Sequence, residues 1–143
     1  MERVGTTKLG IARIYALVFG IAYLSVAVLE VALGNSGLRI GDTQILRVTA
    51  AQNAIHWAVG LAVLGSFFAG EIAAKMTARV VGIVFVAVTV LGFVARDFTG
   101  TLLGFDVPLP WAYNVVHLAT AVFALFAGFA AERGYRGRPQ MAA

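Results

Sequence analysis

The sequence contains no cysteine, and only 13% of its residues are charged. The absence of cysteine excludes disulfides, thiolate metal sites and cysteine nucleophiles. The charged fraction is about half that of an ordinary soluble domain, whereas 60% of the residues are hydrophobic and the mean hydropathy is +0.87. A chain of 143 residues with this composition is therefore predicted to reside in a lipid bilayer.

Long apolar stretches occur four times along the chain. One helical crossing of a bilayer needs about 20 mainly apolar residues. The stretches that meet this length are approximately 9–33, 49–70, 73–95 and 110–131. None of them alternates polar with apolar residues as a barrel strand does, so each is predicted to be a helix. The predicted fold class is an all-α integral membrane protein, a four-transmembrane-helix bundle that forms a single membrane domain over 1–143.

Lysine and arginine are distributed unevenly between the two sides of the predicted spans. Eight of the eleven lie in the N-terminal segment, in the turn between the second and third spans, and in the tail 133–143. The positive-inside rule then predicts that both termini are cytoplasmic, and we assign the protein to a bacterial inner membrane. The tail arginines are predicted to meet anionic lipids of the inner leaflet. They are Arg133, Arg136 and Arg138. Nucleic-acid binding is not indicated, because no soluble domain remains to carry it.

The second and fourth predicted spans carry the same motif, an asparagine followed three residues later by a histidine. Asn53 and His56 recur as Asn114 and His117, which lie 61 residues further on, and these are the only two histidines in the chain. Three residues of helical separation put each asparagine on the same face as its histidine. Because polar side chains within a span face the bundle interior, we expect the four to form one intramembrane cluster at equal depth.

The motif belongs to a longer internal similarity. At the 61-residue spacing the second and fourth spans share seven residue pairs between Asn53/Asn114 and Glu71/Glu132. The first and third align less well, at a spacing of 66 residues, which pairs Glu30 with Arg96. We therefore predict two hairpin repeats, 8–71 and 75–132, with the same orientation in the membrane. At their outer ends Glu30, Arg96 and Asp97 are interpreted as exposed charges, with Glu30 and Arg96 as a surface ion pair.

Three roles for the Asn/His cluster are open. In the first, which we favour, the side chains hydrogen-bond one another between helices and hold no cofactor. In the second, His56 and His117 ligate haem b or a transition metal, although two imidazoles alone make an incomplete metal site. In the third, the histidines handle protons or ions, because imidazole changes charge near neutral pH. No catalytic residue is predicted, because no serine lies at helical spacing from a histidine or carboxylate, so the protein is not expected to be an enzyme.

Small residues recur every fourth position on two of the predicted spans. They are Ala54, Ala58, Ala62, Ser66 and Gly70 on the second, and Thr120, Ala124 and Gly128 on the fourth. Such stripes let helix backbones approach closely in lipid. We favour packing within the monomer, and a homo-oligomer or a membrane-protein partner is the alternative.

With two N-x-x-H helices and basic cytoplasmic ends, the chain resembles the small actinobacterial membrane proteins that are collected as a domain of unknown function. The resemblance covers most of the chain, and the segment NAIHWAVG is its most specific part. It implies a bacterial inner-membrane protein of four helices and no reaction. The sequence thus predicts a protein with a structural role, a role in assembly, or a role in binding a partner.

Overall fold

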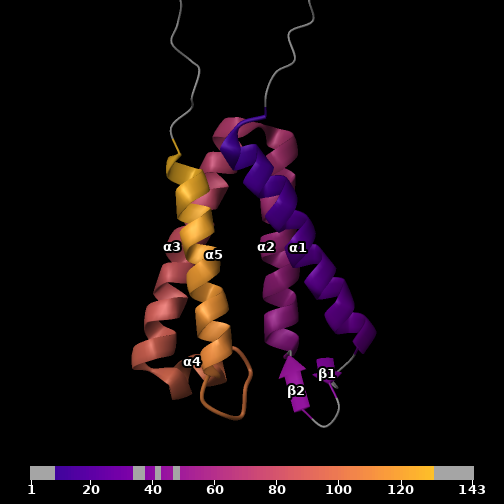
Figure 1. The fold of residues 1–143 in the computed structure, drawn as a ribbon, viewed down its shortest axis with the longest axis vertical. Helices are drawn as coiled ribbons and strands as arrows, with labels where there is room; N and C mark the ends of the chain where they lie inside the picture. Colours follow the sequence, from indigo (N-terminus) through magenta and orange to yellow (C-terminus); the bar gives the residue numbers. More distant parts are fainter. Residues whose placement is uncertain (1–8, 34–37, 41–42, 47–48, 131–143) are drawn as a thin grey trace, which may run out of the picture.

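The computed structural model describes residues 9–33, 38–40, 43–46 and 49–130, and Figure 1 shows their arrangement. The elements in chain order are α1 (Ile11–Leu33), β1 (Leu38–Ile40), β2 (Thr43–Leu46), α2 (Ala50–Ala69), α3 (Glu71–Val94), α4 (Arg96–Leu102) and α5 (Trp111–Phe129). The prediction of a helical protein is confirmed. The antiparallel pair β1–β2 and the short helix α4 were not predicted. The tail arginines lie outside the described residues.

Three of the helices, α1, α3 and α5, are long and apolar enough to cross a membrane. They correspond to the first, third and fourth predicted spans. Helix α2 has 20 residues but is not among the three. Its first two turns contain Gln52, Asn53 and His56, and these polar residues lower its hydropathy.

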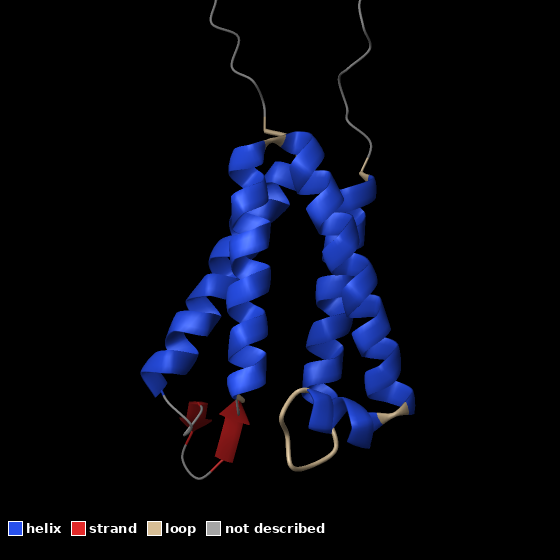
Figure 2. Ribbon diagram, turned by 180° about the vertical axis from the view of Figure 1, so that it is seen from behind, coloured by secondary structure: helices blue, strands red, loops and turns tan. Residues whose placement is uncertain are grey.

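The four long helices pair into two antiparallel hairpins, α1 with α2 and α3 with α5. Figures 1 and 2 show that the hairpins meet at the turn between α2 and α3 and diverge toward the end where α4 and the strands lie. The turn is tight because Gly70 has a φ of 106°, a conformation that glycine adopts without steric cost. The start of α1 and the end of α5 lie at the same narrow end as this turn.

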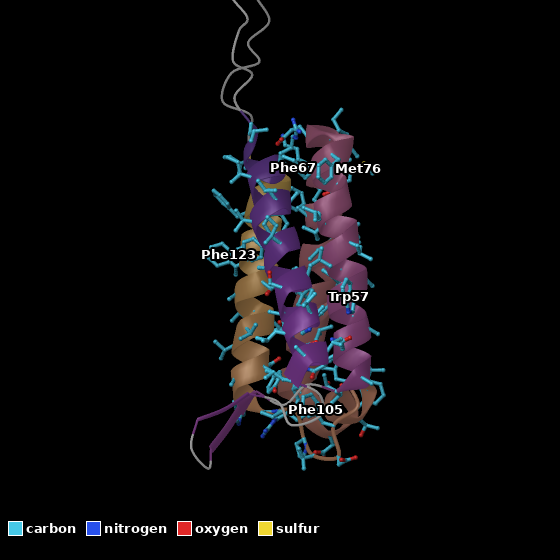
Figure 3. All side chains as sticks on the ribbon, turned by 90° about the vertical axis from the view of Figure 1, so that its right-hand side faces the viewer. Trp57, Phe67, Met76, Phe105 and Phe123 are labelled. Atoms are coloured by element: carbon cyan, nitrogen blue, oxygen red, sulfur yellow. The ribbon has the colours of Figure 1, made fainter. Side chains whose placement is uncertain are left out.

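The interior is built from small residues and the surface from large apolar ones. The main core cluster is rich in alanine: Ala12, Ala16, Ala74, Ala78, Ala124 and Ala127. Large side chains project outward around the helices in Figure 3, and Phe123 and Met76 are 55% and 61% exposed. This distribution suits a protein whose solvent is lipid, because close helix packing in a bilayer depends on small interface residues.

The small-residue stripes divide between the interior and the surface. On α5, Thr120, Ala124 and Gly128 are buried within the monomer. On α2, by contrast, Ser66 is buried but Ala54, Ala58 and Ala62 are exposed. The α5 stripe therefore serves packing within the chain, and most of the α2 stripe faces outward.

In both hairpins, an arginine of one helix donates a hydrogen bond to the other helix at the narrow end. Arg13 of α1 donates from Nε to the carbonyl oxygen of Phe67 at 3.1 Å, and Arg79 of α3 donates from Nε to that of Gly128 at 2.8 Å. Each guanidinium also lies 4.8 Å from the centroid of a phenylalanine ring, Phe67 or Phe129. These arginines therefore satisfy carbonyls at the C-terminal ends of α2 and α5, which have no partner within their own helices.

Candidate functional site

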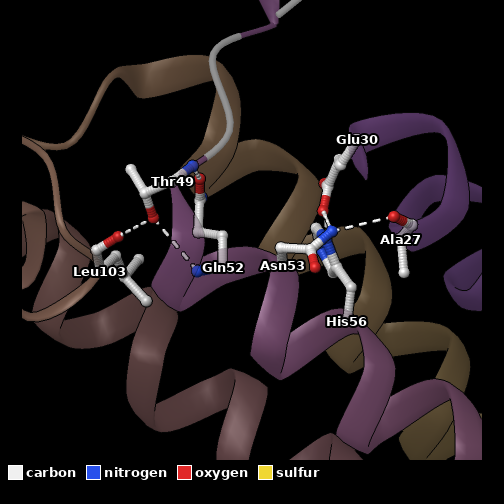
Figure 4. Close-up of polar contacts among 7 residues, drawn as sticks. All are labelled: Ala27, Glu30, Thr49, Gln52, Asn53, His56 and Leu103. Atoms are coloured by element: carbon white, nitrogen blue, oxygen red, sulfur yellow. Dashed lines mark hydrogen bonds and ion pairs between the residues drawn. The ribbon is translucent and has the colours of Figure 1, made fainter. Parts of the chain in front are cut away.

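A buried carboxylate lies at the centre of the first Asn/His motif. The side chain of Glu30, near the end of α1, is only 4% exposed, and its Oε1 lies 2.7 Å from His56 Nδ1. Its Oε2 accepts a hydrogen bond from Asn53 Nδ2 at 2.8 Å, and the same amide donates to the carbonyl oxygen of Ala27 at 2.9 Å (Figure 4). Asn53 and His56 thus share one acidic partner, because their helical spacing presents both side chains to α1.

This geometry corrects the interpretation of the outer-end charges as a surface ion pair. Glu30 is buried and bound to Asn53 and His56. Arg96, at the start of α4, instead donates through Nε and Nη2 to the carbonyl oxygen of Leu109 at 3.1 and 2.9 Å, and its guanidinium lies 4.7 Å from the Trp111 ring centroid. Its neighbour Asp97 is exposed in the first turn of α4. Glu30 therefore belongs with Asn53 and His56, and Arg96 binds the loop that precedes α5.

The second Asn/His motif lacks such a partner. Asn114 is 1% exposed, and within the described part of the chain neither its Nδ2 nor its Oδ1 has a hydrogen-bond partner. The Nδ1 atom of His117 is likewise buried without a partner there. Asn114 packs against Gly92 of α3, where a Cβ atom would collide with the amide. The two motifs therefore have the same residues and different surroundings.

The two histidines line one cavity between the hairpins. It has a volume of about 300 Å³, and its wall is mainly apolar. The polar groups on the wall are Tyr23, Glu30, Gln52, His56, Tyr113, His117 and Thr120. The structure thus places His56 and His117 on one cavity and adds Glu30. In the described part of the chain, however, the four side chains of the two motifs do not form the single hydrogen-bonded cluster that the sequence predicted, because Asn53 and His56 bind Glu30 and the second motif has no partner. Asn53 and Asn114 do not line the cavity, because each faces the other helix of its own hairpin.

Aromatic rings connect the two imidazoles. The ring of Tyr23 lies 6.1 Å from His56 and 6.2 Å from Phe85, and Phe85 lies 5.6 Å from His117, measured between centroids. Each histidine therefore packs on an aromatic ring from its own hairpin, and those two rings meet between the hairpins. No group of three or more histidine, aspartate or glutamate side chains with the geometry of a metal site occurs among the residues that the structure describes.

A polar contact joins the hairpins at the wide end of the cavity. Thr49 caps α2, since its Oγ1 accepts from the Gln52 amide at 3.1 Å and the Gln52 side chain accepts from the Thr49 amide at 3.3 Å. The Thr49 hydroxyl also donates to the carbonyl oxygen of Leu103, in the loop after α4 (Figure 4). The cap therefore orients Gln52 on the cavity wall and fastens α2 to the second hairpin.

One known family matches the chain. The family described as "Domain of unknown function (DUF4383)" matches residues 13–130, which include both hairpins and the cavity. No curated protein and no solved structure matches the chain.

Proposed function

This chain belongs to the DUF4383 family, a domain of unknown function, and we propose that it is a four-span membrane protein that binds a partner molecule in the cavity between its hairpins. The observation that carries this proposal is the cavity of about 300 Å³, whose mainly apolar wall contains the buried Glu30 paired with the partly exposed His56. Pockets with an apolar wall and a few convergent polar groups are typical ligand sites. An ionisable residue inside a membrane bundle is costly and usually functional.

The fourth crossing is assigned to α2. Its 20 residues extend for about 30 Å, which is the thickness of the hydrocarbon core. The polar groups in its first turns have partners inside the protein: Asn53 and His56 bind Glu30, and Gln52 takes part in the cap of Thr49. These bonds offset the cost of placing the groups in the bilayer, so α2 can cross despite its lower hydropathy.

The proposed location is a bacterial inner membrane, with both termini cytoplasmic. The narrow end of the hairpins, near the basic residues Arg13, Lys75 and Arg79, is then the cytoplasmic end. The tail arginines, close in sequence to the end of α5, would meet anionic lipids on that side. The cavity-lining residues Glu30, Gln52 and Ala112 lie near the other ends of their helices, toward the opposite leaflet. Single cysteines at Ser36, Lys75 and Gly137 in this cysteine-free chain test the arrangement, and an impermeant thiol reagent on intact cells should label only position 36.

The two hairpins are proposed to be copies of one ancestral hairpin. A spacing of 61 residues relates α2 to α5, as the sequence suggests. Burial and close packing support a spacing of 62 for α1 and α3, in place of 66. At 62, the buried residues Ala12, Ala16 and Gly20 correspond to the buried residues Ala74, Ala78 and Gly82. Gly20 packs on Leu64, and Gly82 packs on Leu125, 61 residues later. Glu30 then corresponds to Gly92.

Binding explains the site better than catalysis or the two other roles. The described helices present no nucleophile beside the Glu30–His56 pair, so we propose no reaction. A haem held by His56 and His117 needs a porphyrin-sized gap between the two imidazoles. Two aromatic rings lie along this path instead, because Tyr23 packs on His56 and Phe85 packs on His117. Proton handling is the stronger alternative, because the buried carboxylate on His56 can share a proton with it. A homo-oligomer is supported only by the exposed alanines of α2.

The binding proposal is tested by filling the cavity. Val116 lies on the cavity wall, and Val116→Trp should occupy the space without removing a polar group. Protein purified in nanodiscs from its native membrane is expected to hold a small molecule near one-to-one, detected by native mass spectrometry, which this variant loses. Val122→Trp is the matched control and should retain it, because Val122 also lies on α5 and is similarly exposed but does not line the cavity. An empty wild-type protein, or equal loss from both variants, would contradict a specific site.

A further inference from the structure

The second hairpin contains two polar groups that the fold leaves unpaired. In the first hairpin, the Asn53 Nδ2 and His56 Nδ1 atoms both bind the Glu30 carboxylate. The equivalent atoms in the second hairpin, Asn114 Nδ2 and His117 Nδ1, are buried and have no partner within the described residues. A buried polar group without a hydrogen bond is costly, and each such group in a native protein calls for an explanation.

The missing partner is identified by the comparison of the two hairpins. At the 62-residue spacing, the position of Glu30 is taken by Gly92, which has no side chain. Arg96, the next charged residue along the chain, is engaged with the carbonyl oxygen of Leu109. The second hairpin thus retains the two groups that bind a carboxylate in the first, but the described residues place no carboxylate beside them.

We propose that Asn114 and His117 form a subsite for the carboxyl group of a bound amphiphile, such as a fatty acid, which takes the place that Glu30 has in the first hairpin. This proposal rests on the proposed binding function and names the class of ligand. One carboxyl oxygen accepts from Asn114 Nδ2, and the other pairs with His117 Nδ1. One proton shared between the carboxyl group and the imidazole leaves the pair without net charge, which is the arrangement that a buried site tolerates.

The rest of the cavity suits the apolar tail of such a molecule. Apart from its polar groups, the wall is formed by apolar side chains, among them Phe19, Val26, Phe85 and Val116. The cavity is partly open, so the part of a tail that exceeds its volume of about 300 Å³ can extend into the surrounding lipid. A carboxylate head with an aliphatic tail therefore fits both parts of the site.

Binding requires two local movements. His117 is on the cavity wall, but its Nδ1 atom is buried, and the Asn114 amide packs against Gly92 away from the wall. The imidazole therefore turns to present Nδ1 to the carboxyl group, and Asn114 turns from Gly92 toward the ligand. These changes are side-chain rotations within α5 and need no rearrangement of the helices.

The test measures binding of decanoate labelled with ¹³C at its carboxyl carbon. Wild-type protein in nanodiscs of zwitterionic phosphatidylcholine is titrated, and the carboxyl resonance is compared with that in empty nanodiscs. We expect a distinct bound resonance and at least tenfold tighter binding of decanoate than of its methyl ester. His117→Ala should abolish the bound resonance, and Asn114→Ala should weaken binding at least fivefold. Val122→Ala, on the exposed surface of α5, is the control variant.

The possible outcomes distinguish a failure of the carboxylate subsite from a failure of the proposed binding function. Equal affinity for decanoate and its ester would overturn the carboxylate subsite and leave a cavity that binds neutral molecules. Competition by acetate as strong as that by decanoate would show a water-soluble carboxylate and refute the role of the tail. Binding of none of these probes would refute the subsite, and the native-membrane experiment on Val116→Trp judges the general function separately. If His117→Ala fails to fold, Val116→Trp, which keeps the imidazole, should still block decanoate.

Discussion

Replacing His56 with leucine should destabilise the protein far more than the same change at His117. The two histidines occupy equivalent helix positions, but His56 Nδ1 lies 2.7 Å from the buried carboxylate of Glu30, and His117 Nδ1 has no partner in the described chain. The change His56→Leu leaves Glu30 with Asn53 as its remaining side-chain partner. Losing one partner of a buried pair costs about 3–5 kcal/mol in soluble proteins, whereas side-chain hydrogen bonds in membrane bundles contribute about 0.6 kcal/mol on average and at most about 1.7.

The expected loss lies between those limits, for two structural reasons. The Asn53 bond to Glu30 remains, and the carboxyl group can take up a proton and lose its charge, so a loss of about 1–3 kcal/mol is expected for His56→Leu. The change His117→Leu removes an unpaired polar atom and should be neutral or stabilising by up to about 1 kcal/mol. In the double variant Glu30→Leu/His56→Leu, most of the lost stability should return, because no unpaired charge remains.

Reversible unfolding in mixed micelles of dodecyl maltoside and SDS, followed by tryptophan fluorescence, measures these free energies. The ligand-free protein is used, so that binding at His117 does not contribute. Equal losses at His56 and His117 would refute the assigned difference between the hairpins. A double variant less stable than His56→Leu alone would show that Glu30 is held by contacts other than the imidazole.

Three further changes test the packing of the hairpins in the same unfolding assay. Gly20→Val should cost about 1–3 kcal/mol, because a Cβ at Gly20 lies 2.7 Å from the Leu64 backbone nitrogen, whereas Gly65→Val, where no atom lies within 4 Å, should be nearly neutral. Arg13→Met and Arg79→Met should each cost about 0.5–1.5 kcal/mol, and clearly unequal losses would argue against equivalent roles. Thr49→Val should cost about 1 kcal/mol through loss of the α2 cap, and an unchanged stability would show that the cap is replaced by water.

Composition and apolar run length were sufficient to predict the helical fold and three helices that can cross a membrane. The fourth crossing that we propose for α2 depends on tertiary contacts, because α2 carries its polar residues in its first two turns and their partners come from α1 and from the cap. The pair β1–β2 and helix α4 lie in short polar loops, where hydrophobic periodicity carries no signal.

The cluster was predicted in part, because helical spacing identifies a shared face but not the partner helix. The sequence placed His56 and His117 toward the interior, and both line the cavity. It assigned Glu30 to the surface, because that residue lies near the end of a span and the 66-residue alignment paired it with Arg96. The antiparallel register of the first hairpin contains the missing signal. Gly20 faces Leu64 and Gly60 faces Leu24, and the same register continued outward places Glu30 beside Asn53.

The proposed duplication relates the two Asn/His motifs to one another. A hairpin that carried Glu30 and then duplicated would place a carboxylate beside each motif. On this proposal, the change to Gly92 removed one carboxylate and kept the asparagine and histidine that bound it. Within the described residues, Asn114 Nδ2 and His117 Nδ1 are then carboxylate-binding groups without a partner, and we expect an incoming carboxyl group to restore the pairing at this one position. The proposed site would take one ligand per chain, because only the second hairpin has a glycine in place of Glu30.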